Sequence, residues 1–447
     1  MILGLFTLVL ILINSSPEID GYSEQIDPLY KEVRRLEQIV DTEHDKIVEV
    51  DKKIENYIRA KRVRLERSHF SPEVHKNLTE VVQAWQEPIV TLVLVCNRVD
   101  AIRNHLLKLL KYRPSSEQFP IVVSQDCDNE DVANEVRKYE PYVKYIKHIS
   151  GEKANLNIPA NNQRYTAYYR IARHYKLALT HVFETLHYNS VIITEDDLDV
   201  SPDFFDYFRG TRWLLEKDPT LYCVSAWNDN GKPSLIDKNA HDLLYRSDFF
   251  PGLGWMLTSK LWEEMGPIWP EGFWDDWIRD PARRKNRSCI RPEISRTAMT
   301  LYGKKGASKG LFFNNHLIKI ITNDVPVNFT KLNLNYLLKD QYDGPFLDKI
   351  YSIQQLTIDE LIKETLKKRE SSTSFRVQYS SMHEYTNIAR RLNIMIDTKA
   401  GVPRTAYHGI VTCFINNVRI YVAPSSRDGW TGYDKNWEPP SDSIAKK

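Results

Sequence analysis

The sequence predicts an α/β protein with a mainly parallel or mixed sheet, an N-terminal helical stalk and a smaller C-terminal α+β domain. From residue 89 on, short apolar runs alternate with stretches of helical periodicity, which is typical of a parallel sheet. Charged sequence with a heptad seam precedes this region, and three strand-like runs follow residue 340. The predicted parts are a short apolar segment (1–20), the stalk (21–87), the main α/β domain (88–340) and the smaller domain (341–447).

The first segment opens with a nearly continuous apolar run, MILGLFTLVLILIN. The run is shorter than the roughly 20 residues that span a bilayer, and no Lys or Arg precedes it. A cleaved signal and a short type II membrane anchor both remain open. We therefore expect a targeting segment, which contacts the membrane if it is retained.

The stalk is predicted from apolar residues at alternating steps of three and four, beginning with Leu29, Val33, Leu36 and Val40. The residues between them are densely charged, as on a helix that buries a single stripe. We expect a helix that self-associates through this seam. The alternative is one long helix packed on the globular part.

The main domain is predicted to contain four strands, with helical stretches after the first three. The strands lie at residues 89–95, 120–124, 143–146 and 190–194. In parallel sheets the ligand site lies outside the carboxyl ends of the strands, so the residues that follow each strand matter most. Those residues are polar here: Cys96-Asn97-Arg98, Gln125-Asp126-Cys127 and Glu195-Asp196-Asp197.

The run of acids at residues 195–197 is the strongest single feature of the sequence. Three adjacent carboxylates repel one another, so a cationic group is expected beside them. Their hard oxygen atoms suit Mg²⁺ or Mn²⁺ bridging a diphosphate better than Zn²⁺. An alternative is that Ser201 caps a helix and Asp203 lies in its first turn. That helix start would explain Asp203 but not the three acids.

The smaller domain is predicted from a helix-like stretch at 357–368 and strand-like runs at 375–379, 409–414 and 418–422. Asn416-Asn417 lies between the last two runs and is a candidate for a tight turn. These segments indicate an α+β arrangement.

The charge balance argues against a nucleic-acid partner. The chain has 61 basic and 59 acidic side chains, a net charge of +2, so no strong basic field attracts phosphodiester backbone. Its five Cys include no CxxC pair, which argues against a zinc knuckle or a thioredoxin-type site. Two disulfides with one thiol left over are allowed.

Several long blocks of the sequence resemble the N-acetylglucosaminyltransferase I family, collinearly from Ile89 to Trp437. The blocks are YRPS (112–115), SQDC (124–127), YRIARHY (169–175), EDDL (195–198), CVSAWNDNGK (223–232), FFPGLGW (249–255), FWDDW (273–277) and RPEISRT (291–297). So many blocks in one order make a chance match implausible.

The resemblance implies a glycosyltransferase A type fold, with a nucleotide-sugar-binding catalytic domain over residues 88–340. It also implies Mn²⁺-dependent, inverting transfer of GlcNAc from UDP-GlcNAc, in β-1,2 linkage, to the α-1,3-linked mannose of a high-mannose N-glycan. The catalytic domain would lie in the Golgi lumen. The alternatives are an O-mannose β-1,2-GlcNAc transferase and a non-catalytic sugar-binding relative.

The family's site residues carry over by motif. Asp197 would be the Mn²⁺ ligand and Asp275 the catalytic base, with Asp276 as the alternative base. The residues implied to contact UDP-GlcNAc are Arg98, Asp126, His174, Asp196 and Ser308. The resemblance also implies disulfides from Cys96 to Cys127 and from Cys223 to Cys289, which leaves Cys413 as the odd thiol.

Overall fold

The computed structural model describes residue 35 and residues 87–427, apart from residues 152, 308, 309, 311 and 368–372. The expected apolar segment and nearly all of the expected stalk lie outside the described residues, so both stay predictions. Within the described ranges, no helix is both long and apolar enough to cross a membrane.

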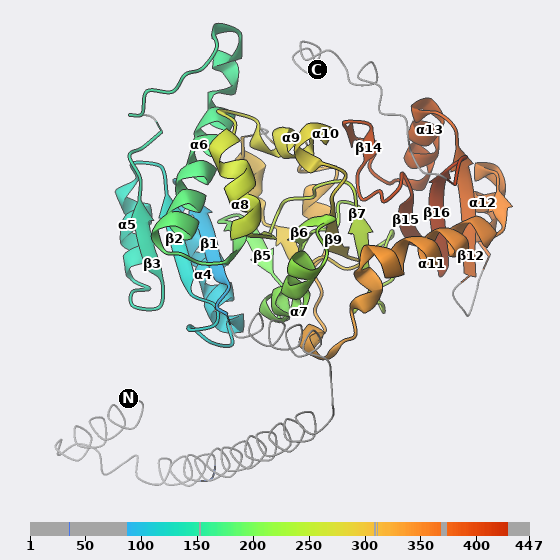
Figure 1. Cartoon of the computed structure of the whole chain (residues 1–447), viewed down its shortest axis with the longest axis horizontal. Helices are drawn as coiled ribbons and strands as arrows, with labels where there is room; N and C mark the ends of the chain where they lie inside the picture. The colour runs from blue at the N-terminus through green and yellow to red at the C-terminus, as the bar shows by residue number, and fades with distance from the viewer. Residues whose placement is uncertain are drawn as a thin grey trace, which may run out of the picture. The chain divides into compact units, whose positions relative to one another are not determined.

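The main part of the chain is built on an eight-stranded mixed sheet in the order β3-β2-β1-β4-β8-β6-β9-β7 (Figure 1). The strands are β1 (Val90–Val95), β2 (Ile121–Gln125), β3 (Lys144–Lys147), β4 (Ser190–Glu195), β6 (Leu221–Ser225), β7 (Leu244–Ser247), β8 (Trp255–Thr258) and β9 (Ser288–Pro292). The first four strands in this order pair in parallel, while β8 is antiparallel to both of its neighbours. The four strands expected from the sequence are confirmed to within two residues at each end.

Helices cover both faces of this sheet (Figure 1). Alternate residues of β1 point to opposite faces, so Val93 belongs to one apolar core and Leu92 to the other. Helices α4 (Val99–Tyr112), α5 (Glu130–Arg137) and α7 (Phe204–Lys217) pack in the first core. Helices α6 (Thr166–Thr180), α8 (Ser259–Met265) and α9 (Trp274–Arg279) pack in the second.

The alternative interpretation, in which Ser201 caps the helix after the acidic run, is wrong. Helix α7 begins at Phe204 with Asp203 as its cap residue, and Ser201 donates a hydrogen bond of 2.7 Å to the Asp203 carboxylate instead of capping. The Asp203 carboxylate binds the guanidinium of Arg296 at 3.0 Å, and both side chains are almost fully buried. This carboxylate is therefore held by a buried cation rather than by the helix end.

A second sheet, in the order β11-β12-β16-β15, is formed by the C-terminal part of the chain. The strands of this sheet are β11 (Gln355–Leu356), β12 (Thr373–Tyr379), β15 (Val411–Ile415) and β16 (Val418–Pro424). The same part of the chain contains α11 (Lys339–Ser352), α12 (Ile358–Thr365), α13 (Met382–Leu392), β13 (Thr398–Lys399) and β14 (Val402–Pro403). The remaining short elements, which come earlier in the chain, are β5 (Leu198–Val200), α10 (Pro281–Arg284) and β10 (Thr297–Met299). Asn416 and Asn417 form the expected two-residue turn, both with positive φ, as a type I′ turn requires. The boundary of a separate domain at residue 341 stays a prediction.

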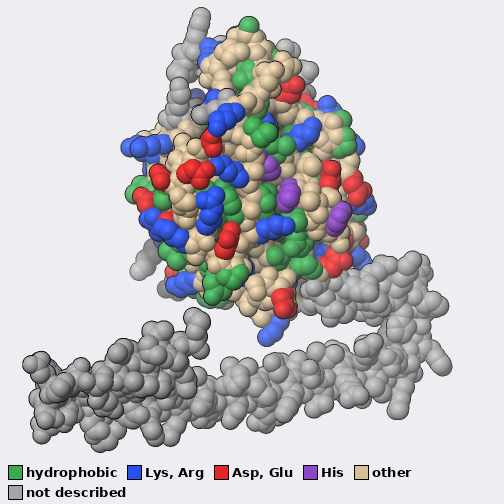
Figure 2. All heavy atoms as spheres, turned by 90° about the vertical axis from the view of Figure 1, so that its left-hand side faces the viewer, with side chains coloured by type: hydrophobic (Ala, Val, Ile, Leu, Met, Phe, Trp, Pro, Cys, Tyr) green, Lys and Arg blue, Asp and Glu red, His purple; other side chains and the backbone are tan. Residues whose placement is uncertain are grey.

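The surface over α5 and β3 carries charges of both signs. Figure 2 shows Lys and Arg interspersed with Asp and Glu on this face. Several of them are paired, among them Lys147 with Glu130 and Lys153 with Asp128. This face therefore presents no large patch of one sign.

Candidate active site

The predicted donor-binding residues lie where three neighbouring parallel strands end. Leu94 of β1 is in register with Glu195 of β4, and Val95 of β1 is in register with Gln125 of β2. The polar residues that follow these strands therefore meet at one edge of the sheet. We call this edge, with Arg98, Asp126, Asp196 and Asp197, the donor edge.

Arg98 is the cation that offsets the repulsion within the acidic run. Its guanidinium donates to the Asp197 carboxylate at 2.8 Å and to both oxygens of Asp196. Burial raises the pKa of Asp196 to about 7, against the opposing charge of Arg98. Arg98 thus holds two adjacent carboxylates in one orientation at the end of β4.

The donor edge fits a divalent metal ion. Asp197 uses Oδ2 to bind Arg98, but its Oδ1 is buried without a hydrogen-bond partner in the described part of the chain. Such an unpaired buried oxygen is costly unless a ligand completes it. No three His, Cys, Asp or Glu side chains among the described residues group as a metal site. One carboxylate is nonetheless compatible with Mg²⁺, which in proteins is often bound through one or two carboxylates plus substrate phosphates.

Asp126 and His174 lie together at the end of β2. Asp126 forms an ion pair of 2.5 Å with Arg173 of α6, and burial raises the pKa of its carboxyl to about 6. His174, the next residue of α6, contacts the Ser124 hydroxyl of β2 through Nε2 at 2.9 Å. Burial lowers the pKa of His174 to about 3, so its imidazole is neutral at neutral pH. The structure thus brings both predicted residues to the donor edge.

Both expected disulfides are formed. The Cys96–Cys127 bridge joins the segments that follow β1 and β2, with 4.8 Å between the Cα atoms. The second bridge joins Cys223 of β6 to Cys289 of β9, and Cys413 is left as a buried free thiol. The first bridge fastens two loops of the donor edge to each other.

The predicted contact at Ser308 lies outside the described residues and stays a prediction. The preceding segment, Leu301–Lys305, does reach the donor edge. The carbonyl of Tyr302 accepts a hydrogen bond of 3.1 Å from Arg98, and the Tyr302 hydroxyl accepts one of 3.0 Å from Asn104. Sequence reasoning did not identify Tyr302, because a backbone acceptor leaves no signal in the residue type.

Asp275 and Asp276 both lie in the first turn of α9, but their partners differ. Arg279 donates to Asp275 at 2.9 Å and to Asp276 at 3.1 Å. Asp276 also binds Lys399 of β13 at 3.0 Å, so each of its oxygens has a cationic partner. Burial acts to raise the pKa of Asp276, but Arg279 and Lys399 outweigh it and lower the pKa. Asp275 is the less engaged of the two carboxylates.

A contact that the sequence did not reveal connects the donor edge to α9. The Tyr175 hydroxyl of α6 donates to the Glu195 carboxylate at 2.8 Å. The Tyr175 ring stacks on Trp274, the residue before Asp275, with 4.2 Å between ring centroids. Burial and the Asp197 charge raise the pKa of Glu195 to about 7. The acidic run and Asp275 are therefore linked through one tyrosine.

Comparisons with known proteins place the sequence in a family. The GNT-I family matches residues 2–437 of the chain. An Arabidopsis thaliana protein named alpha-1,3-mannosyl-glycoprotein 2-beta-N-acetylglucosaminyltransferase is 37% identical over 357 residues, which is 78% of each chain.

Two solved structures are more distant. TarS 1–349 of S. aureus is 12% identical with a TM-score of 0.34, covering 48% of this chain and 60% of that one. The mannosyltransferase PcManGT of Pyrobaculum calidifontis, in complex with GDP-Man and Mn²⁺, is 15% identical with a TM-score of 0.28, covering 40% and 47%. Because the family match spans nearly the whole sequence and the plant relative is 37% identical over most of it, the chain belongs to the GNT-I family.

Proposed function

We propose that the protein transfers GlcNAc from UDP-GlcNAc, in β-1,2 linkage and with inversion, to the α-1,3-linked mannose of a high-mannose N-glycan. The observation that carries this proposal is the match of the GNT-I family to residues 2–437, and the unpaired, buried Oδ1 of Asp197 at the edge where three parallel strands end supports a metal-assisted reaction there. Membership of the GNT-I family and the name of the plant relative support the choice of sugar and acceptor.

The donor edge would bind UDP-GlcNAc. Arg98, Asp126 and His174 follow or flank the strand ends and would contact the nucleotide sugar, together with Asp196 and Ser308. Mn²⁺, when bound through Asp197, would offset the charge that develops on the departing UDP. Arg98 and its pairing with both carboxylates would keep Asp197 oriented for this contact.

Asp275 would accept the proton of the mannose 2-hydroxyl while that oxygen attacks the anomeric carbon. An inverting reaction needs the base and the leaving UDP on opposite sides of this carbon. Asp275 suits the role better than Asp276, because Asp276 is held by two cations through its two oxygens. Asp275 has Arg279 alone as a charged partner among the described residues.

The cellular setting belongs to the proposal as well. The apolar start of the sequence, MILGLFTLVLILIN, supports a membrane anchor that holds the catalytic part in the Golgi lumen. The heptad seam of the stalk supports self-association. Fluorescence microscopy of the tagged chain and its sedimentation after detergent extraction test these two points.

One assay tests the reaction and both alternatives. The full chain is incubated with UDP-GlcNAc and either a five-mannose N-glycan or an O-mannosyl peptide, with Mn²⁺ or with a chelator. We expect β-1,2-GlcNAc on the N-glycan alone, and only when metal is present. Product on the O-mannosyl peptide would favour the O-mannose transferase. Glycan binding without any product would favour the non-catalytic relative.

A further inference from the structure

Two buried polar atoms that follow strand β6 have no hydrogen-bond partner within the described ranges. They are the indole Nε1 of Trp227 and the Oδ2 of Asp229. The two residues are 0% and 1% exposed, so bulk water does not solvate these atoms. Because unpaired buried polar groups are rare and costly, each of them calls for a ligand or a trapped water.

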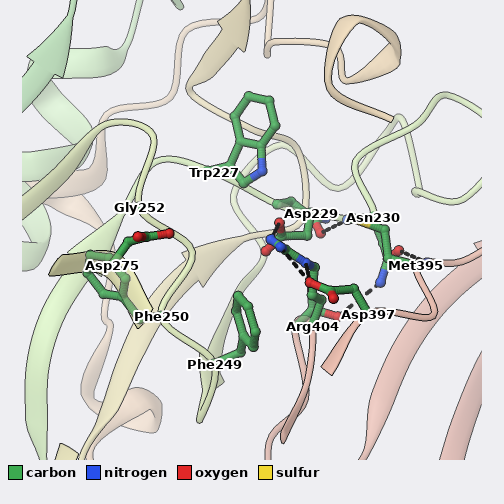
Figure 3. A network of polar contacts seen from close by, with 12 residues as sticks. Trp227, Asp229, Asn230, Phe249, Phe250, Gly252, Asp275, Met395, Asp397 and Arg404 are labelled. Carbon is green, nitrogen blue, oxygen red and sulfur yellow. Dashed lines mark hydrogen bonds and ion pairs between the residues drawn. The ribbon is translucent and has the colours of Figure 1, made fainter. Parts of the chain in front are cut away.

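The Asp229 carboxylate is held in a fixed orientation by the C-terminal part of the chain. Its Oδ1 binds Arg404 at 2.7 Å, and Arg404 is held in turn by Asp397 at 2.8 Å (Figure 3). The neighbouring Asn230 accepts a hydrogen bond of 2.8 Å from the backbone N–H of Met395. With one oxygen engaged in this way, Oδ2 is left as a preorganised acceptor.

This network lies next to the predicted base. The guanidinium of Arg279, which binds Asp275, lies 4.8 Å from the centre of the Phe249 ring, and the guanidinium of Arg404 lies at the same distance from it. Figure 3 shows Phe249 between Asp275 and the Arg404–Asp229 pair. A single phenylalanine therefore connects the cation that holds Asp275 to the cation that holds Asp229.

The backbone beside Phe249 turns sharply, and it holds one non-glycine residue, Leu253, in the left-handed region that only glycine adopts without strain. Gly252, Leu253 and Gly254 have φ values of 69°, 50° and 91°, three consecutive residues in the left-handed region. A β-carbon on Gly254 would lie 2.6 Å from the Thr297 side chain. Strain of this kind persists where the surrounding structure enforces it, often beside a ligand.

We propose that Trp227 Nε1 and Asp229 Oδ2 bind a hydroxyl of the acceptor glycan while its reacting hydroxyl lies against Asp275. This inference rests on the proposed function. A sugar hydroxyl both donates and accepts, so it satisfies an N–H donor and a carboxylate acceptor together. The pair follows β6, which runs parallel to β4 and lies two strands away from it, and it is connected to Asp275 through Phe249.

The test is Asp229→Asn in the full chain, which keeps the shape of the side chain but removes its charge. We expect kcat/KM for the five-mannose glycan to fall at least about tenfold, the effect of losing one charged hydrogen bond. The KM for UDP-GlcNAc should stay unchanged. Asp397→Asn is the matched control, because it weakens the same Arg404 network but leaves Asp229 Oδ2 in place. Its kcat/KM should fall clearly less than that of Asp229→Asn.

Acceptors that lack one hydroxyl identify the contact directly. The series covers the hydroxyls of the α-1,3-linked mannose, apart from the reacting one, and those of the sugar that carries it. For one of these acceptors, kcat/KM with the wild-type chain should be about tenfold lower than for the complete glycan, whereas with Asp229→Asn the two values should be similar. Trp227→Phe, which removes the N–H, should lose the same sensitivity and stands in if Asp229→Asn does not fold by circular dichroism.

The outcomes separate the two proposals. A wild-type chain that transfers no GlcNAc to the glycan overturns the proposed function and this inference with it. An active wild type with an equal loss in Asp229→Asn and Asp397→Asn, or with no acceptor that distinguishes wild type from variant, overturns this inference alone.

Discussion

At the scale of single residues, position along a strand could be predicted but partners could not. The run of acids at 195–197 follows an apolar strand, which places it at a sheet edge from the sequence alone. The sequence did not identify Arg98 as the compensating cation, because Arg98 reaches Asp196 and Asp197 only when β1 pairs with β4. Arg98 is separated from these two acids by 98 and 99 positions along the chain. The Tyr175–Glu195 contact was missed for the same reason.

The base assignment predicts unequal effects for two neighbouring substitutions. Asp275→Asn should lower kcat by about 10² to 10⁴, because the amide cannot accept the acceptor proton. Asp276→Asn should lower it less than about tenfold, since both oxygens of Asp276 are already engaged by Arg279 and Lys399. Initial rates at saturating substrates measure both, and a larger loss at Asp276 would move the base by one residue.

The metal assignment predicts that Asp197→Ala removes metal-dependent binding of UDP-GlcNAc and lowers transfer by at least about 10². The fold should stay intact, because Asp197 lies after β4 and not in an apolar core. Titration calorimetry with and without Mn²⁺ measures the binding. Asp199→Ala is the control, as it removes an acid two residues away that pairs with Lys108 at 2.8 Å. Equal binding by Asp197→Ala and wild type would remove the assignment.

At the scale of elements, periodicity predicted the four strands that pair in parallel, β3-β2-β1-β4. The other half of the sheet was not predicted, because its order β8-β6-β9-β7 brings together strands that are not consecutive in the sequence. Local sequence rules put Ser201 at the cap of α7, and this was wrong because the Asp203 carboxylate binds a buried partner, Arg296. Local capping rules carry no information about such a partner.

The buried pair beneath α7 predicts a large loss of stability. Asp203→Asn leaves the Arg296 guanidinium without its anionic partner in a site that is 0% exposed, and should lower the free energy of unfolding by about 3 to 5 kcal/mol. Asp199→Asn breaks the partly exposed pair with Lys108 and should cost less than about 1 kcal/mol. Urea unfolding followed by fluorescence measures both. Similar losses of unfolding free energy in the two variants would contradict the conclusion that Asp203 is held by the buried Arg296.

At the scale of the molecule, two sheets share buried contacts that the sequence did not indicate. Leu235, from the part of the chain that forms the large sheet, packs in the core of the C-terminal sheet. Glu293 binds Arg419 of β16 at 2.9 Å, and both are largely buried. The sequence pattern changes visibly near residue 340, but the sequence does not reveal these long-range pairs. They bear directly on whether the C-terminal part unfolds by itself.

These shared contacts predict one unfolding transition for the two sheets. The described residues between 87 and 427 belong to one compact unit. The pairs Arg419–Glu293 and Arg404–Asp229 would be left as unpaired buried charges if one sheet unfolded alone, which costs several kcal/mol for each. Scanning calorimetry should give a single peak whose van't Hoff and calorimetric enthalpies agree.

Substitution at the shared contacts sharpens this prediction. Arg419→Met removes the cation of one pair, leaves Glu293 buried without it, and should lower the single melting temperature of both sheets together. Lys349→Met is the control, because that side chain lies on α11 with its ammonium 5.9 Å from the Tyr421 ring and pairs with no acid among the described residues. Two resolved peaks, with only the smaller one shifted by Arg419→Met, would show instead that residues 341–447 fold as the separate domain expected from the sequence.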